Sequence, residues 1–337
     1  MNERISLLIP THNRHPYLKR ALAYYSDAGF RTYIVDSSPQ AFHLQEQPDL
    51  VYYHMPGVSL TGKIAAALEV IQTPYIVMCA DDDFLLPERI LDCMDFLEAH
   101  PEYASVAGNS ICYKKNSIAS GKVDFAAMYT SRLSYEVTDK APLDRIRAFF
   151  NPYRGAFYAV HRTAVLRKAF EGAAGVVKNL FLNEYLTALY PLATGAFAEL
   201  PFLFHIREYA DDSGDKTTAN LDAIFHDDAF KKEYEGFVAH QAALIASSLA
   251  LAPAECQQQL RAILDDFARQ HLDGAYKEKP APEKKLGDIV RQLPLIGDKL
   301  IQAYRKYRSS QSLQLFVRTP EDEKKLEEIA QLILTYQ

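Results

Sequence analysis

Short apolar runs alternate with helix-like patterns along the first 90 residues. Runs rich in β-branched and aromatic residues predict strands, at 5–10, 32–35, 50–53 and 74–80. Between them, apolar residues recur three and four positions apart, which predicts helices at 16–25 and 60–71. Strands that alternate with helices are typical of a mostly parallel sheet with covering helices. The sequence therefore predicts an α/β fold for this part of the chain.

The pattern changes along the rest of the chain. Further strands are expected at 104–108, 111–113 and 155–160. From about residue 221 long helical patterns take over, at 230–251, 254–272 and 321–336, with a charged, proline-containing linker at 277–285. We therefore expect an α/β domain over 1–220 and a helical C-terminal extension over 221–337.

Three consecutive acids, Asp81, Asp82 and Asp83, directly follow the predicted strand at 74–80. Acids at the end of a buried strand repel one another and are costly to desolvate. A divalent metal that carries a phosphate would remove both costs. Ligands bind at the carboxyl ends of parallel strands, so Thr11 and Asp36, which also end strands, are expected in the same crevice.

Composition and charge narrow the classes of function. The chain has 337 residues and is 48% hydrophobic, which is ample for a core. With 37 basic and 43 acidic residues its formal charge is -6, which argues against a nucleic-acid binder. Four widely spaced cysteines are typical of buried thiols in a reducing compartment. Because the sequence shows neither a signal-peptide pattern nor an 18-residue apolar run, we expect a cytoplasmic protein.

Four motifs, taken in order, resemble those of a GT-A glycosyltransferase, most closely family 2. They read SLLIPTHNR at 6–14, VDSS at 35–38, GKIAAA at 62–67 and DDDFLLP at 81–87. The resemblance covers 5–87 well and extends more weakly to about residue 209. It implies a Rossmann-like sheet flanked by helices, with nucleotide-sugar binding in 1–100 and the acceptor part in 101–220. It also implies transfer of a sugar from a nucleotide diphosphate sugar to a hydroxyl acceptor.

The resemblance places the donor nucleotide at the ends of the first strands. The residues expected to contact it are Pro10, Thr11, Asn13, Arg14, Asp36, Lys63, Asp81 and Asp82. Asp83 would bind Mn²⁺ or Mg²⁺, hard cations that prefer oxygen ligands and diphosphate. Taken singly, Asp36 or Lys63 is better explained as a surface or turn residue.

Candidate residues for chemistry follow further along the chain. Glu184 matches the second acid of a family pair that supplies the catalytic base, and Asn183 stands at the first. His205 resembles a histidine that completes the metal site, and Arg154 and Arg207 are candidate phosphate or acceptor contacts. Three of them have a plainer interpretation: Glu184 as a first-turn helix acid, His205 as a structural histidine, and Arg154 as an exposed arginine.

The motifs also differ from the family pattern. Family members often carry an additional acid where this chain has Ala80, and a second acid where it has Ser37. Which acid of the triplet binds metal, and whether the reaction inverts or retains the anomeric configuration, therefore stay open.

A basic amphipathic stretch at 286–308 is compatible with an anionic membrane surface. That placement, at the inner face of the membrane, would suit a lipid-linked saccharide acceptor and bacterial surface polysaccharide or glycan assembly. The same stretch is also explained by packing on the catalytic domain or on another subunit of an oligomer. The polar segment 209–218 is either a loop that closes over the donor or a plain surface loop.

Two other functions stay open. A sugar-1-phosphate nucleotidyltransferase would share the sheet and the metal acids, but it normally has a glycine-rich loop after the first strand, and residues 10–14 contain no glycine. The second is a non-catalytic sugar-nucleotide-binding or scaffold domain whose helical extension binds a partner.

Overall fold

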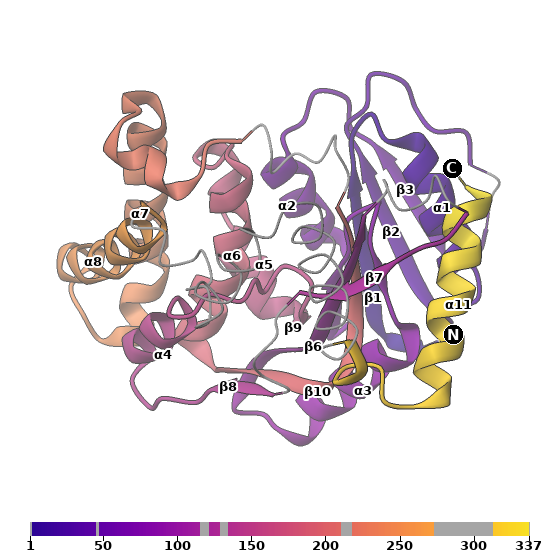
Figure 1. The fold of residues 1–337 in the computed structure, drawn as a ribbon. Coiled ribbons are helices and arrows are strands. Elements are labelled where there is room, and N and C mark those ends of the chain that lie inside the picture. Colours follow the sequence, from indigo (N-terminus) through magenta and orange to yellow (C-terminus); the bar gives the residue numbers. More distant parts are fainter. Residues whose placement is uncertain are drawn as a thin grey trace, which may run out of the picture.

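The computed structural model describes residues 2–44, 47–114, 121–128, 134–209, 218–272 and 313–336. In these residues ten strands form one sheet flanked by helices (Figure 1). The main path of the sheet runs β3-β2-β1-β4-β9-β6-β10-β5, with β7 beside β6 and β8 beside β10. The predicted α/β fold with a mostly parallel sheet is confirmed.

The first four strands form a parallel unit. They are β1 (Asn2–Thr11), β2 (Phe30–Asp36), β3 (Leu50–His54) and β4 (Tyr75–Met78). β1 lies between β2 and β4, and its register pairs Thr11 with Asp36 and Leu8 with Met78. β4 is buried along its whole length, as expected of a parallel strand covered on both faces. The four strands therefore bring their carboxyl ends to one edge of the sheet.

The second half of the sheet is mixed. It consists of β5 (Phe84–Leu85), β6 (Tyr103–Lys114), β7 (Phe125–Ala127), β8 (Tyr135–Val137), β9 (Val160–Arg162) and β10 (Ala196–Tyr209). The two long strands β6 and β10 pair in parallel, whereas the short ones pair antiparallel. The two strands expected at 104–108 and 111–113 are one continuous strand, β6.

The strand expected at 155–160 is mostly wrong. The ladder begins only at Val160, because the residues before it form a turn. The Ala156 carbonyl accepts hydrogen bonds from the Ala159 backbone N–H (3.1 Å) and from His161 Nε2 (2.9 Å). This turn frees Tyr158 from the sheet, and its side chain reaches Asp83 instead.

Capping residues explain where several of the helices begin. The helices are α1 (His15–Tyr25), α2 (Leu60–Val70), α3 (Pro87–Ala99), α4 (Pro142–Phe149), α5 (Thr163–Phe170), α6 (Leu180–Thr194), α7 (Asp228–Leu249), α8 (Pro253–Leu272) and α11 (Pro320–Thr335), with 3-10 turns η2 (Ala173–Gly175) and η4 (Leu221–Phe225). Ser59 caps α2 by accepting from the Gly62 N–H, and Asn179 caps α6 by accepting from the Phe181 N–H. Asn183 Nδ2 donates to Thr61 Oγ1 (2.9 Å), so the first turns of α2 and α6 meet.

The predicted C-terminal helices are confirmed to within a few residues. In Figure 1, α7 and α8 pack beside α6 and α4 on the left, whereas α11 lies against α1 on the right. Phe237 of α7 and Leu264 of α8 belong to the same hydrophobic core as the sheet. By length and composition, no single helix in the described ranges would span a membrane, and α7 and α8 meet that criterion only as a bent pair. The linker at 277–285, the basic stretch at 286–308 and most of the 209–218 loop lie outside the described residues.

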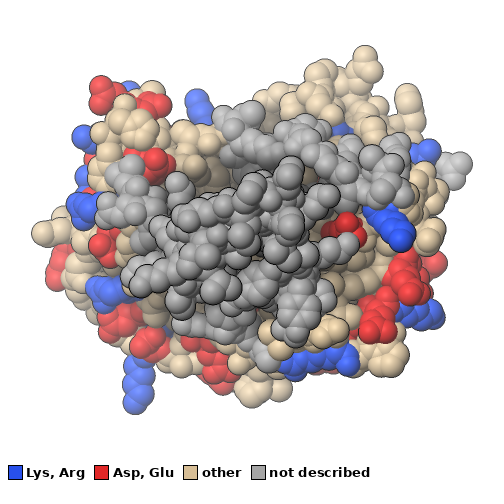
Figure 2. Space-filling view, viewed as in Figure 1, with Lys and Arg blue, Asp and Glu red and all other residues tan. Residues whose placement is uncertain are grey.

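Charges on the visible face are mixed. Figure 2 shows Lys and Arg interspersed with Asp and Glu around its rim, without a broad area of one sign among the described residues. All four cysteines are buried and free of disulfide bonds, as predicted.

The buried histidine of β9 predicts a pH effect on stability. Burial lowers the pKa of His161 from 6.5 to about 4, so between these values the unfolded chain binds a proton that the folded chain does not. Stability should therefore fall as the pH drops from about 6.5 to about 4, by about 2–3 kcal/mol at pH 4.5. Urea unfolding at pH 7 and pH 4.5 should show this loss in the wild type and a smaller loss in His161→Gln. Exposed His226→Gln is the control, and equal losses in all three proteins would contradict the assignment.

Candidate active site

A cavity of about 950 Å³ lies at the carboxyl ends of β1 and β4. Its wall includes twelve of the thirteen residues predicted from the sequence as site residues: Pro10, Thr11, Asn13, Arg14, Lys63, Asp81, Asp82, Asp83, Arg154, Glu184, His205 and Arg207. The thirteenth, Asp36, is fully buried and does not line the cavity. The fold therefore brings residues from both halves of the sheet to one place.

The first two acids of the triplet are tied to β1 and to the loop after it. Thr11 Oγ1 donates to Asp81 Oδ2 (2.6 Å). Arg14 bridges both acids, with Nε 3.2 Å from Asp81 Oδ1 and Nη2 2.5 Å from Asp82 Oδ2. Burial nevertheless raises the pKa of Asp81 to about 6 and that of Asp82 well above its ordinary value. The protein's own cations therefore do not fully offset the burial of this pair.

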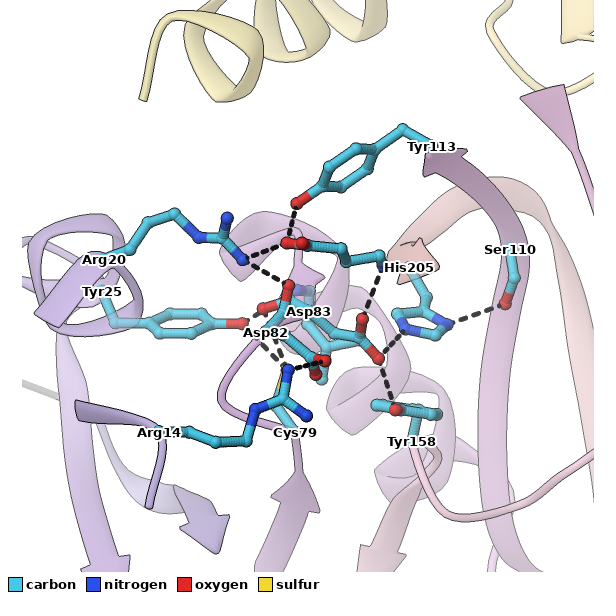
Figure 3. Close-up of polar contacts among 12 residues, drawn as sticks. Arg14, Arg20, Tyr25, Cys79, Asp82, Asp83, Ser110, Tyr113, Tyr158 and His205 are labelled. Atoms are coloured by element: carbon cyan, nitrogen blue, oxygen red, sulfur yellow. Dashed lines mark hydrogen bonds and ion pairs between the residues drawn. The ribbon is translucent and has the colours of Figure 1, made fainter. Parts of the chain in front are cut away.

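Asp83 differs from its two neighbours. Figure 3 shows its carboxylate directed at His205 and Tyr158. Oδ2 accepts from the Tyr158 hydroxyl and lies 3.2 Å from His205 Nε2, while Oδ1 accepts from the Glu208 N–H (2.8 Å). Burial raises the pKa of Asp83, but hydrogen bonds from His205 and Tyr158 outweigh it, and the pKa lies below the ordinary value. Asp83 is therefore the acid of the triplet that stays ionised most readily.

The histidine beside Asp83 is held on three sides. The Tyr158 ring stacks on the His205 ring with centroids 3.9 Å apart. His205 Nδ1 lies 3.1 Å from Ser110 Oγ, and Nε2 faces Asp83. With a side chain only 4% exposed, His205 has a fixed orientation toward the triplet.

A buried ion pair supports the triplet from behind. Arg20 Nη2 donates to Glu208 Oε2 (2.6 Å) and to the Asp82 carbonyl (2.8 Å). The Tyr113 hydroxyl donates to the same glutamate oxygen (2.6 Å). Figure 3 shows Arg20 and Tyr113 on different elements of the chain, each beside the triplet. The network links α1, β6 and β10 to the backbone of the triplet.

Lys63 reaches back to the end of β1. Its Nζ donates to the Thr11 carbonyl and to Ser37 Oγ (3.0 Å). Burial lowers the pKa of Lys63 to about 8. The amine thus carries positive charge at neutral pH at the N-terminal end of α2. Because the side chain is buried, the interpretation of Lys63 as a plain surface lysine is wrong.

Asp36 organises the loop that follows β2. Its carboxylate accepts from the Ser38 N–H (2.8 Å) and the Tyr52 hydroxyl (2.8 Å), and it lies 3.0 Å from His15 Nε2. Burial raises the pKa of Asp36, but the bonds from Ser38 outweigh it, and the pKa lies below the ordinary value. A contact between Asp36 and the base or ribose stays a prediction.

The downstream candidates also line the cavity. Glu184, the fifth residue of α6, accepts a hydrogen bond from the Tyr153 hydroxyl (2.5 Å). The first turn of α6 contains no acid, so the interpretation of Glu184 as a first-turn helix acid is wrong. Arg154 is buried and lies 3.0 Å from Glu199 Oε1, so its description as an exposed arginine is wrong. The Arg207 guanidinium lies 5.2 Å from the centre of the Tyr209 ring.

Sequence reasoning missed several residues of this site, among them Tyr158, Glu208, Arg20 and Tyr153. Tyr158 was hidden by the wrong strand assignment. Glu208 directly follows the site residue Arg207 near the end of β10, and a buried charged residue there is a usable signal. Arg20 interrupts the apolar face of α1, and this interruption is a weaker signal.

The site has few side chains that could bind a metal ion. Within the ranges that the structure describes, no three His, Cys, Asp or Glu side chains are arranged to hold a metal by themselves. Asp83 and His205 are the closest approach to such a group at this site.

Comparisons with known proteins agree with this architecture. Solved structures share the fold, which is of the GT-A type, and two of them are structures of S. aureus TarS. S. aureus TarS 1-349 is 14% identical with a TM-score of 0.50, covering 96% of this chain and 91% of that one. TarS 1-349 in complex with UDP-GlcNAc is 14% identical with a TM-score of 0.53, at 96% and 92% coverage.

The sequence itself defines the family. Residues 6–172 match the model described as glycosyl transferase family 2, and this part of the chain belongs to that family. The predicted resemblance to glycosyltransferase family 2 is thereby confirmed, and the protein is a glycosyltransferase. A search of curated proteins finds no match.

The buried Arg20 pair predicts a large effect on stability. Replacing Arg20 with Leu leaves Glu208 buried without its cation, and we expect a loss of about 3–5 kcal/mol in the free energy of unfolding. Arg4→Leu, which breaks an exposed pair with Glu98, should cost less than about 1 kcal/mol. Urea unfolding measures both, and similar losses in the two variants would contradict the role assigned to Arg20.

Proposed function

We propose that this protein transfers a sugar from a nucleotide diphosphate sugar to a hydroxyl acceptor, with a divalent cation bound at the triplet. One observation carries the proposal: Asp83, paired with His205, faces the same cavity as Lys63 and Glu184. This combination offers a cation site, a positive charge and a carboxylate base around one space. Membership of the glycosyltransferase family supports the same reaction class.

The residues present fit a divalent cation. Asp83 Oδ2 and His205 Nε2 are 3.2 Å apart, so a carboxylate oxygen and an imidazole nitrogen would both be available to hold one cation. A site with two protein ligands suits a cation that shares its coordination with substrate phosphates. When bound, Mn²⁺ or Mg²⁺ would offset the negative charge of the departing diphosphate.

The chain's own cations would assist in holding the donor. Lys63 lies at the start of α2, where backbone N–H groups and the helix dipole favour an anion, and Arg207 lines the cavity beside His205. Both would face charge that grows on the leaving group during transfer. Thr11 would keep Asp81 oriented for the ribose through their hydrogen bond.

Glu184 would remove the proton of the acceptor hydroxyl if the reaction inverts. A base has to lie within hydrogen-bonding reach of the attacking hydroxyl, and Glu184 of α6 lines the cavity. Asn183, buried beside it, bonds Thr61 instead.

The solved structure of TarS with UDP-GlcNAc makes this compound the first donor to test. A saccharide or lipid-linked saccharide is the acceptor that we propose, in the assembly of a bacterial surface polysaccharide or glycan. The nucleotidyltransferase alternative loses ground because residues 6–172 match a glycosyltransferase family. The scaffold alternative is separated by the two experiments that follow.

Removing the charge of Asp83 should abolish cation-dependent donor binding. In wild-type protein, a nucleotide sugar at 100 times its Kd with Mn²⁺ should add about 2.7 kcal/mol of stability. A thermal-shift panel of UDP-GlcNAc, UDP-glucose and GDP-mannose, with and without Mn²⁺, measures this. Asp83→Asn should lose the stabilisation, and exposed Asp95→Asn should keep it. If no nucleotide sugar stabilises the wild type, the proposal fails.

Neutralising Glu184 should separate binding from chemistry. Glu184→Gln keeps the size of the side chain but not its basicity, so we expect slow Mn²⁺-dependent hydrolysis of the stabilising donor to fall about 10²- to 10⁴-fold. The thermal shift produced by that donor should stay. Exposed Glu69→Gln is the matched control, and an undiminished rate in Glu184→Gln would remove it as the base.

A further inference from the structure

The candidate base is held by a tyrosine from a different part of the chain. Tyr153 lies in the segment between α4 and β9, and its hydroxyl donates to Glu184 Oε1 at 2.5 Å. A hydrogen bond from a neutral donor to a carboxylate is short and strong compared with one between neutral groups. It ties one oxygen of a side chain that has several rotatable bonds.

The ring of Tyr153 is itself fixed by aromatic neighbours. It stacks on Phe150 with centroids 5.3 Å apart and an interplanar angle of 22°. Tyr185 meets it edge-on at 5.4 Å and 90°, and Phe267 of α8 packs at 5.4 Å. Aromatic pairs of this kind stabilise their geometry beyond the area that they bury. The phenol is therefore a fixed point and not a mobile surface group.

The same segment limits the carboxylate through its backbone. A Cβ added at Gly155 would lie 2.6 Å from Glu184 Oε1 and 3.9 Å from the Tyr153 hydroxyl. Real Cβ atoms essentially never come that close to another heavy atom, so a side chain at this position displaces the carboxylate. The carboxylate oxygen thus fits between the phenol and a glycine backbone.

We propose that Tyr153 is the positioning residue for Glu184 and that Gly155 leaves the space in which Glu184 is positioned. The inference rests on the proposed function, in which Glu184 takes the proton of the acceptor hydroxyl. With one oxygen held by Tyr153, the plane of the carboxylate is set and its direction toward the acceptor follows. Because a misplacement of about 1 Å can cost about 100-fold in rate, such an anchor contributes to catalysis without touching substrate.

The test uses the full chain, UDP-GlcNAc and Mn²⁺, with donor hydrolysis as the rate and a thermal shift as the measure of donor binding. Tyr153→Phe should lower kcat about 10- to 100-fold, as expected for the loss of a hydrogen bond to a charged group, with the KM for the donor unchanged. Tyr24→Phe removes a buried phenol hydroxyl that has no hydrogen-bond partner among the described residues and should keep the wild-type rate.

Gly155→Ala tests the space independently. The atom in its way is the end of a flexible side chain, so the fold should tolerate the change while the carboxylate moves and kcat falls. Gly175→Ala is the matched control, because no atom lies within 4 Å of its added Cβ.

A double-mutant cycle distinguishes positioning from a structural role. If Tyr153 acts through Glu184, then Tyr153→Phe should have no further effect on kcat in a Glu184→Gln background. A Tyr153→Phe protein with wild-type kcat, or one whose loss is as large in the Glu184→Gln background, overturns the proposal. If Glu184→Gln itself keeps the wild-type rate, the assignment of the base fails instead.

Discussion

Three neighbouring carboxylates are buried at the end of β4, and their desolvation is the constraint around which the other site residues are arranged. Asp81, Asp82 and Asp83 are each less than a tenth exposed. Moving such groups out of water is costly unless charges or donors replace the lost hydration. Arg14 supplies charge to two of them, and Asp83 is satisfied by hydrogen bonds instead.

This compensation is uneven, and the unevenness has a chemical meaning. Asp83 retains a low pKa because of its hydrogen bonds, whereas burial and mutual repulsion raise the pKa of Asp82. A further positive charge at this position would be more strongly bound than at an exposed acid, because burial reduces screening by water. Asp83 is thus the acid of the triplet whose negative charge is held by fixed hydrogen bonds in place of water.

Much of the fold was readable from local sequence patterns. The parallel strands and the helices between them follow from apolar periodicity, and the triplet stood out because acids do not normally end a buried strand. The turn at Ala156 was not readable, since it depends on the hydrogen bond from His161 to the Ala156 carbonyl, which forms only in the folded chain. The runs of apolar residues there fitted a strand equally well.

The positions of residues at the strand ends were also predictable from the sequence, but their partners from distant segments were not. Strand ends supplied Thr11 and Asp81, which indeed bond each other. Partners from distant segments, such as Arg20 with Glu208, could not be paired, because 188 positions separate them along the chain. A buried ion pair between segments so far apart leaves no periodic signal in either one.

The placement of α11 has a consequence for the order in which the protein matures. Phe84, next to Asp83, and Tyr113, which bonds Glu208, share a hydrophobic cluster with Phe316 and with Ile329 of α11. Ribosomal synthesis delivers the triplet early and α11 some 240 residues later, a time of about 10–50 s at typical elongation rates. Until then the apolar wall behind the triplet stays open to water, so the nascent site is completed only by a helix remote in sequence.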